Sequence, residues 1–128
     1  LVNKKIDAEG FEFDAMLEDV ETLNEWALQG KLAITKLSYG VLPLVLDKYA
    51  VLNSGSALGK GVGPVLIKNE ELKIKNIEDY LVAIPGGNTT AHLLFSLAYP
   101  NAKNKIFLRY DEIENFLPIL ILLYLLLK

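Results

Sequence analysis

The stretch Leu81-Val-Ala-Ile-Pro-Gly-Gly-Asn-Thr-Thr-Ala91 decides the fold, because it joins an apolar run, a glycine-rich bend and a helix start. Residues 81–84 predict a buried strand, and the Pro-Gly-Gly sequence that follows cannot continue it. Asn88, Thr89 or Thr90 is the candidate N-cap of a helix. Its apolar positions would be Ala91, Leu93, Leu94, Leu97 and Ala98.

A strand, a glycine turn and a helix start aim free backbone N–H groups and the positive helix end at an anion. The hydroxyl groups of Thr89 and Thr90 would add two donors. An ordinary capped connection explains the same residues, since most strand-to-helix turns bind nothing. Both interpretations stay open on the sequence alone.

Composition narrows the classes of partner. The chain of 128 residues, 52% hydrophobic and 23% charged, fits one domain or two small lobes that share a ligand cleft. A net charge of −3 with no basic patch argues against nucleic acid. Without cysteine, we expect no disulfide, thiolate metal site or cysteine nucleophile, and the single histidine, His92, leaves no histidine-cluster metal motif. No signal peptide shows, but the chain begins with Leu1, so we expect a missing upstream segment.

Alternating strands and helices are expected upstream of the central stretch. Residues 4–13 predict a half-buried strand, and a helix then begins at Asp19 and ends at Gly30. Trp26, beside the apolar stripe of that helix, is expected to pack rather than to recognise a ligand. Residues 32–37 predict a strand buried on both faces, because the run is largely apolar.

Ser38 is the candidate cap of the next helix, although Pro43 lies too deep for its first position, so the helix begins later or is kinked. Residues 49–52 predict a third strand. The glycines at 59, 61 and 63 resemble a dinucleotide fingerprint, but residues 64–67 after them predict a strand instead of a helix. Residues 54–64 are therefore a hinge between lobes or a plain surface loop.

Downstream, residues 68–75 are charged and solvated, and residues 76–80 predict a short helical turn. A turn at 100–104, a strand at 106–108 and a helix capped by Asp111 follow. Strands that alternate with helices at this spacing indicate an α/β architecture. Residues 117–127 lack any polar side chain except a tyrosine hydroxyl and are too short to span a bilayer. They would form a buried strand or helix, or an aggregation hazard if exposed.

Taken together, several motifs resemble one family, the 1,4-dihydroxy-6-naphthoate synthases of the futalosine route to menaquinone. The similarity covers roughly residues 3 to 116, in order. The matching stretches are Leu17-Glu-Asp-Val-Glu-Thr-Leu-Asn24, Thr35-Lys-Leu-Ser38, Asn53-Ser-Gly-Ser-Ala-Leu-Gly59, Gly63-Pro-Val-Leu-Ile67, Ile84-Pro-Gly-Gly-Asn-Thr-Thr-Ala91 and Tyr110-Asp-Glu-Ile113.

The resemblance implies a periplasmic-binding-protein-like fold of type 2, in which two α/β lobes enclose a ligand cleft. Residues 1–67 would belong to the first lobe, and residues 68–128, with the atypical apolar tail 117–127, to the second. It also implies a cytoplasmic lyase that converts cyclic dehypoxanthine futalosine to 1,4-dihydroxy-6-naphthoate without a cofactor. The expected partner is thus a small carboxylate substrate, with neither nucleic acid nor membrane.

In that family, the segments matching Lys36-Leu37-Ser38 and Thr89-Thr90 contact substrate from opposite lobes. Both lie at predicted strand-to-helix junctions, where ligands of open α/β sheets bind. Lys36 would offer charge if it faces inward; the alternative is a structural stem with a solvated head.

The resemblance implies that this chain is incomplete at both ends. The family's first strand and Cys-Pro-Asn-Asp-Thr-like loop would precede Leu1, and its proton-accepting histidine would follow the present end. No residue here is assigned as catalytic. His92 could replace the base, but a helix residue facing its neighbours is the simpler interpretation. Asp111 and Glu112 are expected as a cap and a first-turn carboxylate rather than as an acid–base pair.

Two other functions remain on the sequence alone. A non-catalytic module of the same fold would capture a small anion, and a histidine in the cleft would separate the enzyme from this binder. A structural fragment without its own function would expose apolar surface and dissolve poorly.

Overall fold

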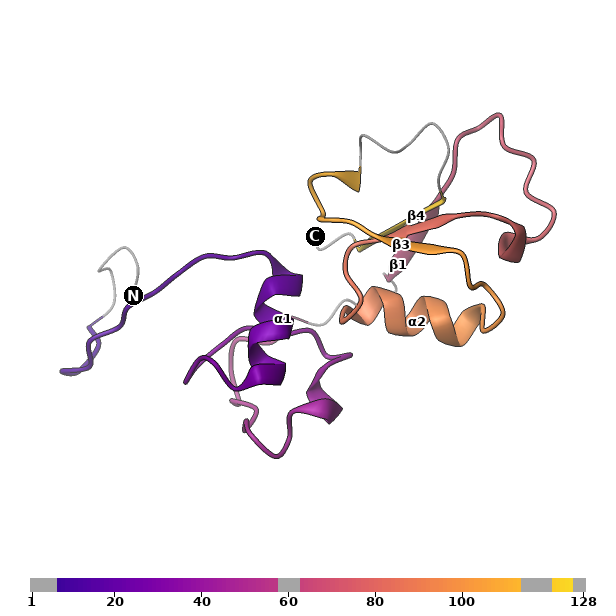
Figure 1. Ribbon diagram of the computed structural model, residues 1–128. Coiled ribbons are helices and arrows are strands. Elements are labelled where there is room, and N and C mark those ends of the chain that lie inside the picture. The colour runs from indigo at the N-terminus through magenta and orange to yellow at the C-terminus, as the bar shows by residue number, and fades with distance from the viewer. Residues whose placement is uncertain (1–6, 58–62, 114–120, 126–128) are drawn as a thin grey trace.

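The computed structural model describes residues 7–57 and 63–113, and the backbone of residues 121–125 (Figure 1). Helices and strands follow one another in an α/β order. They are α1 (Val20–Gln29), the 3-10 turn η1 (Leu42–Leu44), β1 (Pro64–Ile67), the 3-10 turn η2 (Ile77–Asp79), β2 (Val82–Ile84), α2 (Thr90–Ala98), β3 (Lys105–Phe107) and β4 (Ile121–Leu125).

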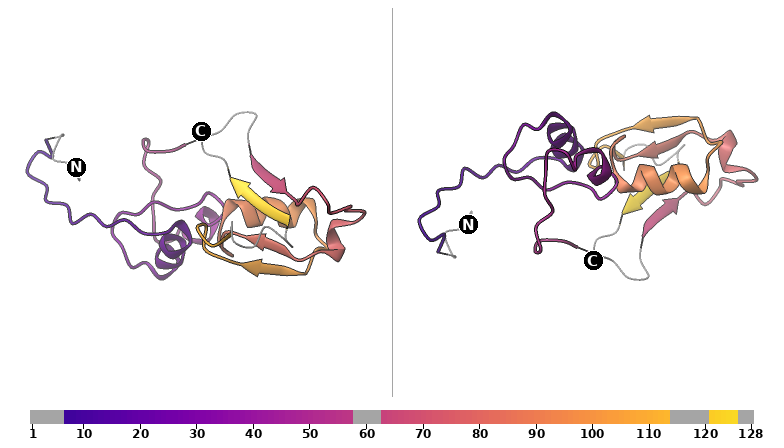
Figure 2. Two further views of the ribbon diagram at one scale, coloured as in Figure 1. Left: turned by 90° about the horizontal axis from the view of Figure 1, so that it is seen from above. Right: turned by 90° about the horizontal axis from the view of Figure 1, so that it is seen from below.

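The four strands form one sheet in the order β1-β4-β2-β3 (Figure 2). β2 runs parallel to both β3 and β4, whereas β1 is antiparallel to β4. Ala83 is the centre of this sheet, because it pairs with Ile106 on one side and Leu122 on the other. The small α/β fold, with a mixed sheet whose central pairs are parallel, agrees with the α/β architecture predicted from the sequence.

Helix α2 covers one face of the sheet, as Figure 1 shows. Side chains alternate along a strand, so Val82 and Ile84 point to the α2 face and Ala83 to the other. Val82 and Ile84 pack with Ala91 and Phe95 of α2, whereas Ala83 packs with Ile113 and its neighbours. β2 is fully buried, which confirms the predicted strand.

The apolar tail contributes an internal strand. β4 pairs with β1 along one edge and with β2 along the other. Residues 122–125 are paired on the β1 side, and Ile121 and Leu122 are paired on the β2 side. Of the alternatives predicted for the backbone of residues 121–125, the strand is therefore the correct one.

Helix α1 begins and ends where the sequence predicts. The Asp19 carboxylate accepts the backbone N–H groups of Glu21 (2.9 Å) and Thr22 (3.4 Å), as an N-cap does. Gly30 ends the helix with φ +68°, a left-handed conformation that favours glycine. Ala27 packs with Val41 and Val45 in a separate small cluster.

The three strands predicted upstream are wrong within the described residues. Residues 7–13, 32–37 and 49–52 are irregular, and Phe11 is 73% exposed and Ile34 67% exposed. An apolar run becomes a strand only when another strand pairs with it, and none does so here. The Tyr49 hydroxyl donates to the Leu32 carbonyl at 2.7 Å, so one side-chain bond joins two of these segments.

The cap predicted at Ser38 is wrong, and the helix begins later, which is one of the two alternatives that Pro43 left open. Only the 3-10 turn η1 forms, with Val41 as its N-cap and Pro43 in its first turn. A helix begun at Ser38 would place Pro43 in its interior, where the ring clashes with the preceding turn. Ser38 therefore caps nothing and bonds to Asn24 instead.

The remaining predictions downstream are confirmed to within one residue. β1, η2 and β3 occupy the positions expected for two strands and a short helical turn. Residues 1–6 and 58–62, with part of the predicted first strand and of the glycine-rich loop, lie outside the described residues. The helix expected after Asp111 falls mostly on 114–120, which also lie outside them.

Candidate functional site

A cavity of about 900 Å³ lies between the α1 half of the chain and the N-terminal end of α2. Figure 1 shows that end of α2 directed toward α1. The walls come from segments far apart in the sequence, chiefly residues 33–39, 49–57 and 89–91. The cavity is thus formed where the two halves of the described chain meet.

All five residues predicted to contact a substrate line this cavity: Lys36, Leu37 and Ser38 on one side, and Thr89 and Thr90 on the other. Their convergence follows from a close backbone approach. The Gly40 N–H donates to the Thr90 hydroxyl at 3.0 Å, and a Cβ built on Gly40 would lie 3.1 Å from the Thr90 Cα. Glycine at position 40 therefore lets the two walls meet.

Ser38 and Thr90 each keep a hydroxyl hydrogen for a ligand. The Ser38 hydroxyl accepts from the Asn24 amide at 3.0 Å, and the Thr90 hydroxyl accepts from Gly40. Within the described residues, neither hydroxyl donates to a protein acceptor. A hydroxyl has one donor as well as its acceptor sites, so both groups can donate into the cavity.

Thr89 has a different role from Thr90. Its hydroxyl donates to the Gly86 carbonyl at 3.0 Å and accepts the His92 N–H at 3.2 Å as the N-cap of α2. The residue is 6% exposed. Because its hydroxyl hydrogen is already donated, Thr89 shapes the helix end and Thr90 presents the free donor.

The electrostatics of the cavity favour an anion. Lys36 is the one charged side chain among the described lining residues, and it is exposed. In the same part of the chain, the backbone N–H groups of Thr90 and Ala91 find no acceptor. Free N–H groups at a helix start carry partial positive charge, which adds to the lysine.

Sequence reasoning missed the aromatic and loop walls. Tyr39, Tyr49 and Tyr110 line the cavity, as do residues 54–57. The Tyr39 hydroxyl is hydrogen-bonded to Ser56, which fastens the loop to the segment after Ser38. The sequence does contain a signal for the loop wall, because the stretch Asn53–Gly59 belongs to the family resemblance. Its pattern alone predicts only a connection.

Asn24 of α1 holds the two walls together from behind. Its side chain is fully buried, and its amide donates to Ser38 (3.0 Å) and to the Asn88 carbonyl (2.9 Å). Its oxygen accepts the Ser38 N–H at 2.8 Å. A buried amide with its groups paired in this way fixes the geometry of all its partners.

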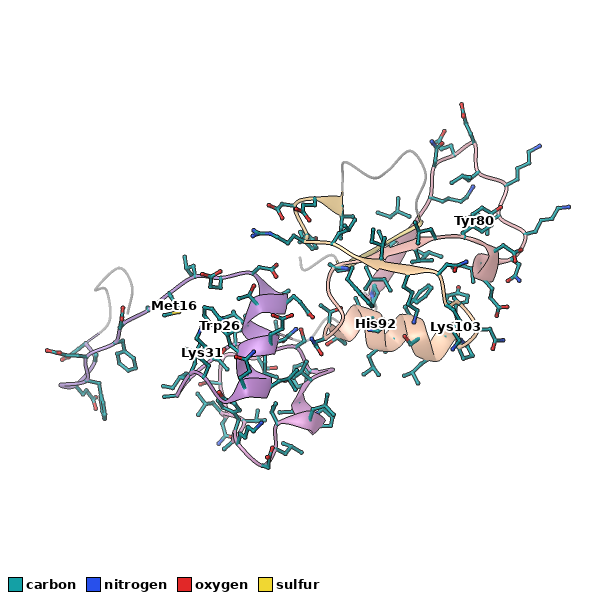
Figure 3. All side chains as sticks on the ribbon, viewed as in Figure 1. Met16, Trp26, Lys31, Tyr80, His92 and Lys103 are labelled. Carbon is teal, nitrogen blue, oxygen red and sulfur yellow. The ribbon has the colours of Figure 1, made fainter. Side chains whose placement is uncertain are left out.

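His92 faces away from the cavity. One ring nitrogen lies 2.7 Å from the Gly87 carbonyl and the other 3.3 Å from the Lys105 ammonium, which itself donates to Ser96. Figure 3 shows His92 along α2, beside the sheet. Burial, with the nearby charge of Lys103, lowers the pKa of Lys105. His92 therefore contacts its neighbours, as the simpler interpretation predicted.

The other candidates for chemistry are structural as well. The Asp111 carboxylate accepts from the Arg109 side chain at 3.2 Å and raises the pKa of that guanidinium, while Glu112 accepts the Arg109 N–H. The Lys31 ammonium lies over the Trp26 ring, 3.6 Å from the ring centroid (Figure 3). In the described part of the chain, no three His, Cys, Asp or Glu side chains gather as a metal site. None of its helices is long and apolar enough to cross a membrane.

Comparisons with known proteins agree on one family. The chain matches the model of a family described as menaquinone biosynthesis over residues 2–117. A 1,4-dihydroxy-6-naphthoate synthase from Thermus thermophilus is 48% identical over 100 residues, which are 78% of this chain and 36% of the relative. The corresponding synthase from Streptomyces coelicolor is 40% identical over 84 residues, 66% of this chain and 29% of the relative. The chain spans about a third of the length of these curated relatives.

Proposed function

The chain belongs to this menaquinone-biosynthesis family, and from that premise we propose that its cavity is a substrate site of a 1,4-dihydroxy-6-naphthoate synthase. The proposed activity is a lyase reaction that converts cyclic dehypoxanthine futalosine to 1,4-dihydroxy-6-naphthoate. One observation carries the proposal. Ser38 and Thr90, from opposite halves of the chain, line a single cavity with Lys36 as its charged residue.

The proposed roles follow from the groups that each residue has free. Lys36 attracts the carboxylate of the substrate, and the N–H groups at the start of α2 add to that field. Ser38 and Thr90 donate their hydroxyl hydrogens to substrate oxygens, and Leu37 supplies apolar contact. Thr89 acts through the helix cap that orients Thr90.

The fold and the setting are part of the same proposal. We infer a periplasmic-binding-protein-like arrangement of type 2, with residues 1–67 in one lobe and residues 68–128 in the other. β1, the last segment of the first proposed lobe, pairs with β4 of the second and so links the two in this proposal. The expected setting is the cytoplasm, with a small carboxylate as partner and no cofactor.

A second function is favoured by one feature of the cavity. Among the described residues that line it, there is no His, Asp or Glu. This wall donates hydrogen bonds but holds no side chain suited to accept a proton near neutral pH. A module that binds a small anion without reaction would have the same lining, so turnover separates the two functions.

The test compares binding with turnover. Isothermal titration of 1,4-dihydroxy-6-naphthoate into the full chain is expected to show one site. Thr90→Val should weaken binding about threefold to tenfold through the lost hydroxyl, whereas Thr90→Ser should bind like the wild type. Ser96→Ala is the control, because Ser96 lies on α2 outside the cavity. Formation of the naphthoate from cyclic dehypoxanthine futalosine supports the enzyme, and binding without it supports the anion module. Equal affinity for the naphthoate in Thr90→Val and the wild type would exclude the proposed substrate site.

A further inference from the structure

A carboxylate lies directly behind the turn that carries Thr90. Glu21, in the first turn of α1, accepts the Asn88 N–H at 2.9 and 3.1 Å and the Asn88 side-chain amide at 2.7 Å. It also accepts from the Asn24 amide at 3.4 Å. Sixty-seven residues separate Glu21 from Asn88, so these bonds join the two halves of the chain.

The turn is shaped to receive this carboxylate. A Cβ built on Gly86 would overlap Glu21 Oε2 and lie 2.6 Å from its Cδ, so an added side chain would displace the carboxylate from this position. Gly86 also has φ +107°, which a residue with a side chain rarely adopts. Two residues of one short turn are therefore arranged around Glu21, although Glu21 itself does not line the cavity.

We propose, on the basis of the proposed function, that Glu21 is a positioning residue that sets the spacing between Thr90 and Ser38 across the substrate site. Asn88 immediately precedes the Thr89 cap, so a fixed Asn88 fixes the start of α2 and the Thr90 hydroxyl. The Thr90 hydroxyl in turn accepts the Gly40 N–H beside Ser38. An error of about 1 Å in such a placement is enough to cost a large factor in activity.

The test uses the full chain with Glu21→Ala, Glu21→Gln and the control Glu25→Gln. Glu25 lies one turn further along α1, is exposed, and has no hydrogen bond or ion pair within the described residues. Two readouts are measured under conditions in which all variants are folded. The first is the hydrogen exchange rate of the Gly40 amide, relative to that of the Leu97 amide inside α2, and the second is the affinity for 1,4-dihydroxy-6-naphthoate.

We expect Glu21→Ala to speed Gly40 exchange and to weaken naphthoate binding, each about tenfold, while Leu97 exchange stays unchanged. Glu21→Gln keeps one oxygen acceptor for Asn88, so its Gly40 exchange rate and its naphthoate affinity should lie between those of Glu21→Ala and the wild type. Glu25→Gln should match the wild type in both readouts.

Two outcomes overturn the proposal. In the first, Gly40 exchange keeps its wild-type rate in Glu21→Ala. In the second, binding tightens in Glu21→Gln, as it would if the carboxylate only repelled the substrate. If the wild-type chain does not bind the naphthoate, the proposed function fails, and Gly40 exchange still decides the role of Glu21.

Discussion

Gly86→Ala tests the contact between the two halves of the chain with one methyl group. The new Cβ would overlap Glu21 Oε2, and the backbone at position 86 has φ +107°. Holding a residue with a side chain in this region costs about 1–3 kcal/mol. Displacement of the carboxylate would also break its bonds to Asn88, and a bond to a charged group is worth about 1.5–3 kcal/mol. We therefore expect a loss of about 2.5–6 kcal/mol in the free energy of unfolding.

Gly87→Ala is the matched control. The nearest atoms to its added Cβ are Glu21 Oε1 at 3.8 Å and the Phe107 ring at 3.9 Å, which are ordinary contacts. Its backbone does not have positive φ. The expected change is below about 1 kcal/mol, because the methyl group fits and the unfolded chain loses freedom.

Urea unfolding followed by circular dichroism measures both variants, and the expected midpoint falls by about 1 M or more for Gly86→Ala only. The double variant Gly86→Ala with Glu21→Ala should be less destabilised than the sum of the single variants, since the same bonds are lost in each. Equal losses for the two glycine variants, or strict additivity in the double variant, would refute the reasoning.

Three further predictions follow from the same contacts. Lys36→Gln should reduce the preference for 1,4-dihydroxy-6-naphthoate over 1,4-dihydroxynaphthalene, which lacks the carboxylate. An unchanged ratio of the two dissociation constants would exclude a charge role for Lys36. Asn24→Ala should cost about 2–4 kcal/mol of unfolding free energy, because it leaves half-buried partners in both walls unpaired. A loss below about 1 kcal/mol in urea unfolding would contradict the bridging role. Phe95→Ala should cost about 3–5 kcal/mol, because Phe95 is 2% exposed between α2 and the sheet, yet naphthoate affinity in the folded protein should change little.

The elements that the sequence predicts correctly are those with local signals. Asp19 and Gly30 bound α1 through contacts with residues of the same helix. The β2 strand, the glycine turn and the Thr89 cap lie within ten residues of one another. Caps and turns depend on neighbours in the chain, so one sequence is enough to place them.

The elements that fail depend on distant partners. Residues 32–37 and 49–52 are as apolar as a strand, but no second strand pairs with either within the described residues. The tail shows the reverse case, because its pattern alone left strand and helix open and pairing with β1 and β2 makes it a strand. Strand formation depends on context in a way that no window of sequence contains.

The sequence predicts residues that share one cavity, but it does not predict their hydrogen bonds. The five proposed contact residues line one cavity, yet Ser38 caps no helix, and the Thr89 hydroxyl donates to Gly86 instead of remaining free. The Glu21 and Asn24 contacts join residues up to 67 positions apart, which no local pattern reveals.

The central claim is that a small carboxylate is bound where the start of α2 faces Ser38. Titration of the full, isotope-labelled chain with 1,4-dihydroxy-6-naphthoate, followed by amide chemical shifts, measures this most directly. We predict saturable shifts at Thr90, Ala91 and Ser38, and all three should saturate only at higher naphthoate concentration when Thr90→Val is combined with Lys36→Gln. Saturable shifts confined to residues outside the cavity, such as those of η2, would contradict the claim.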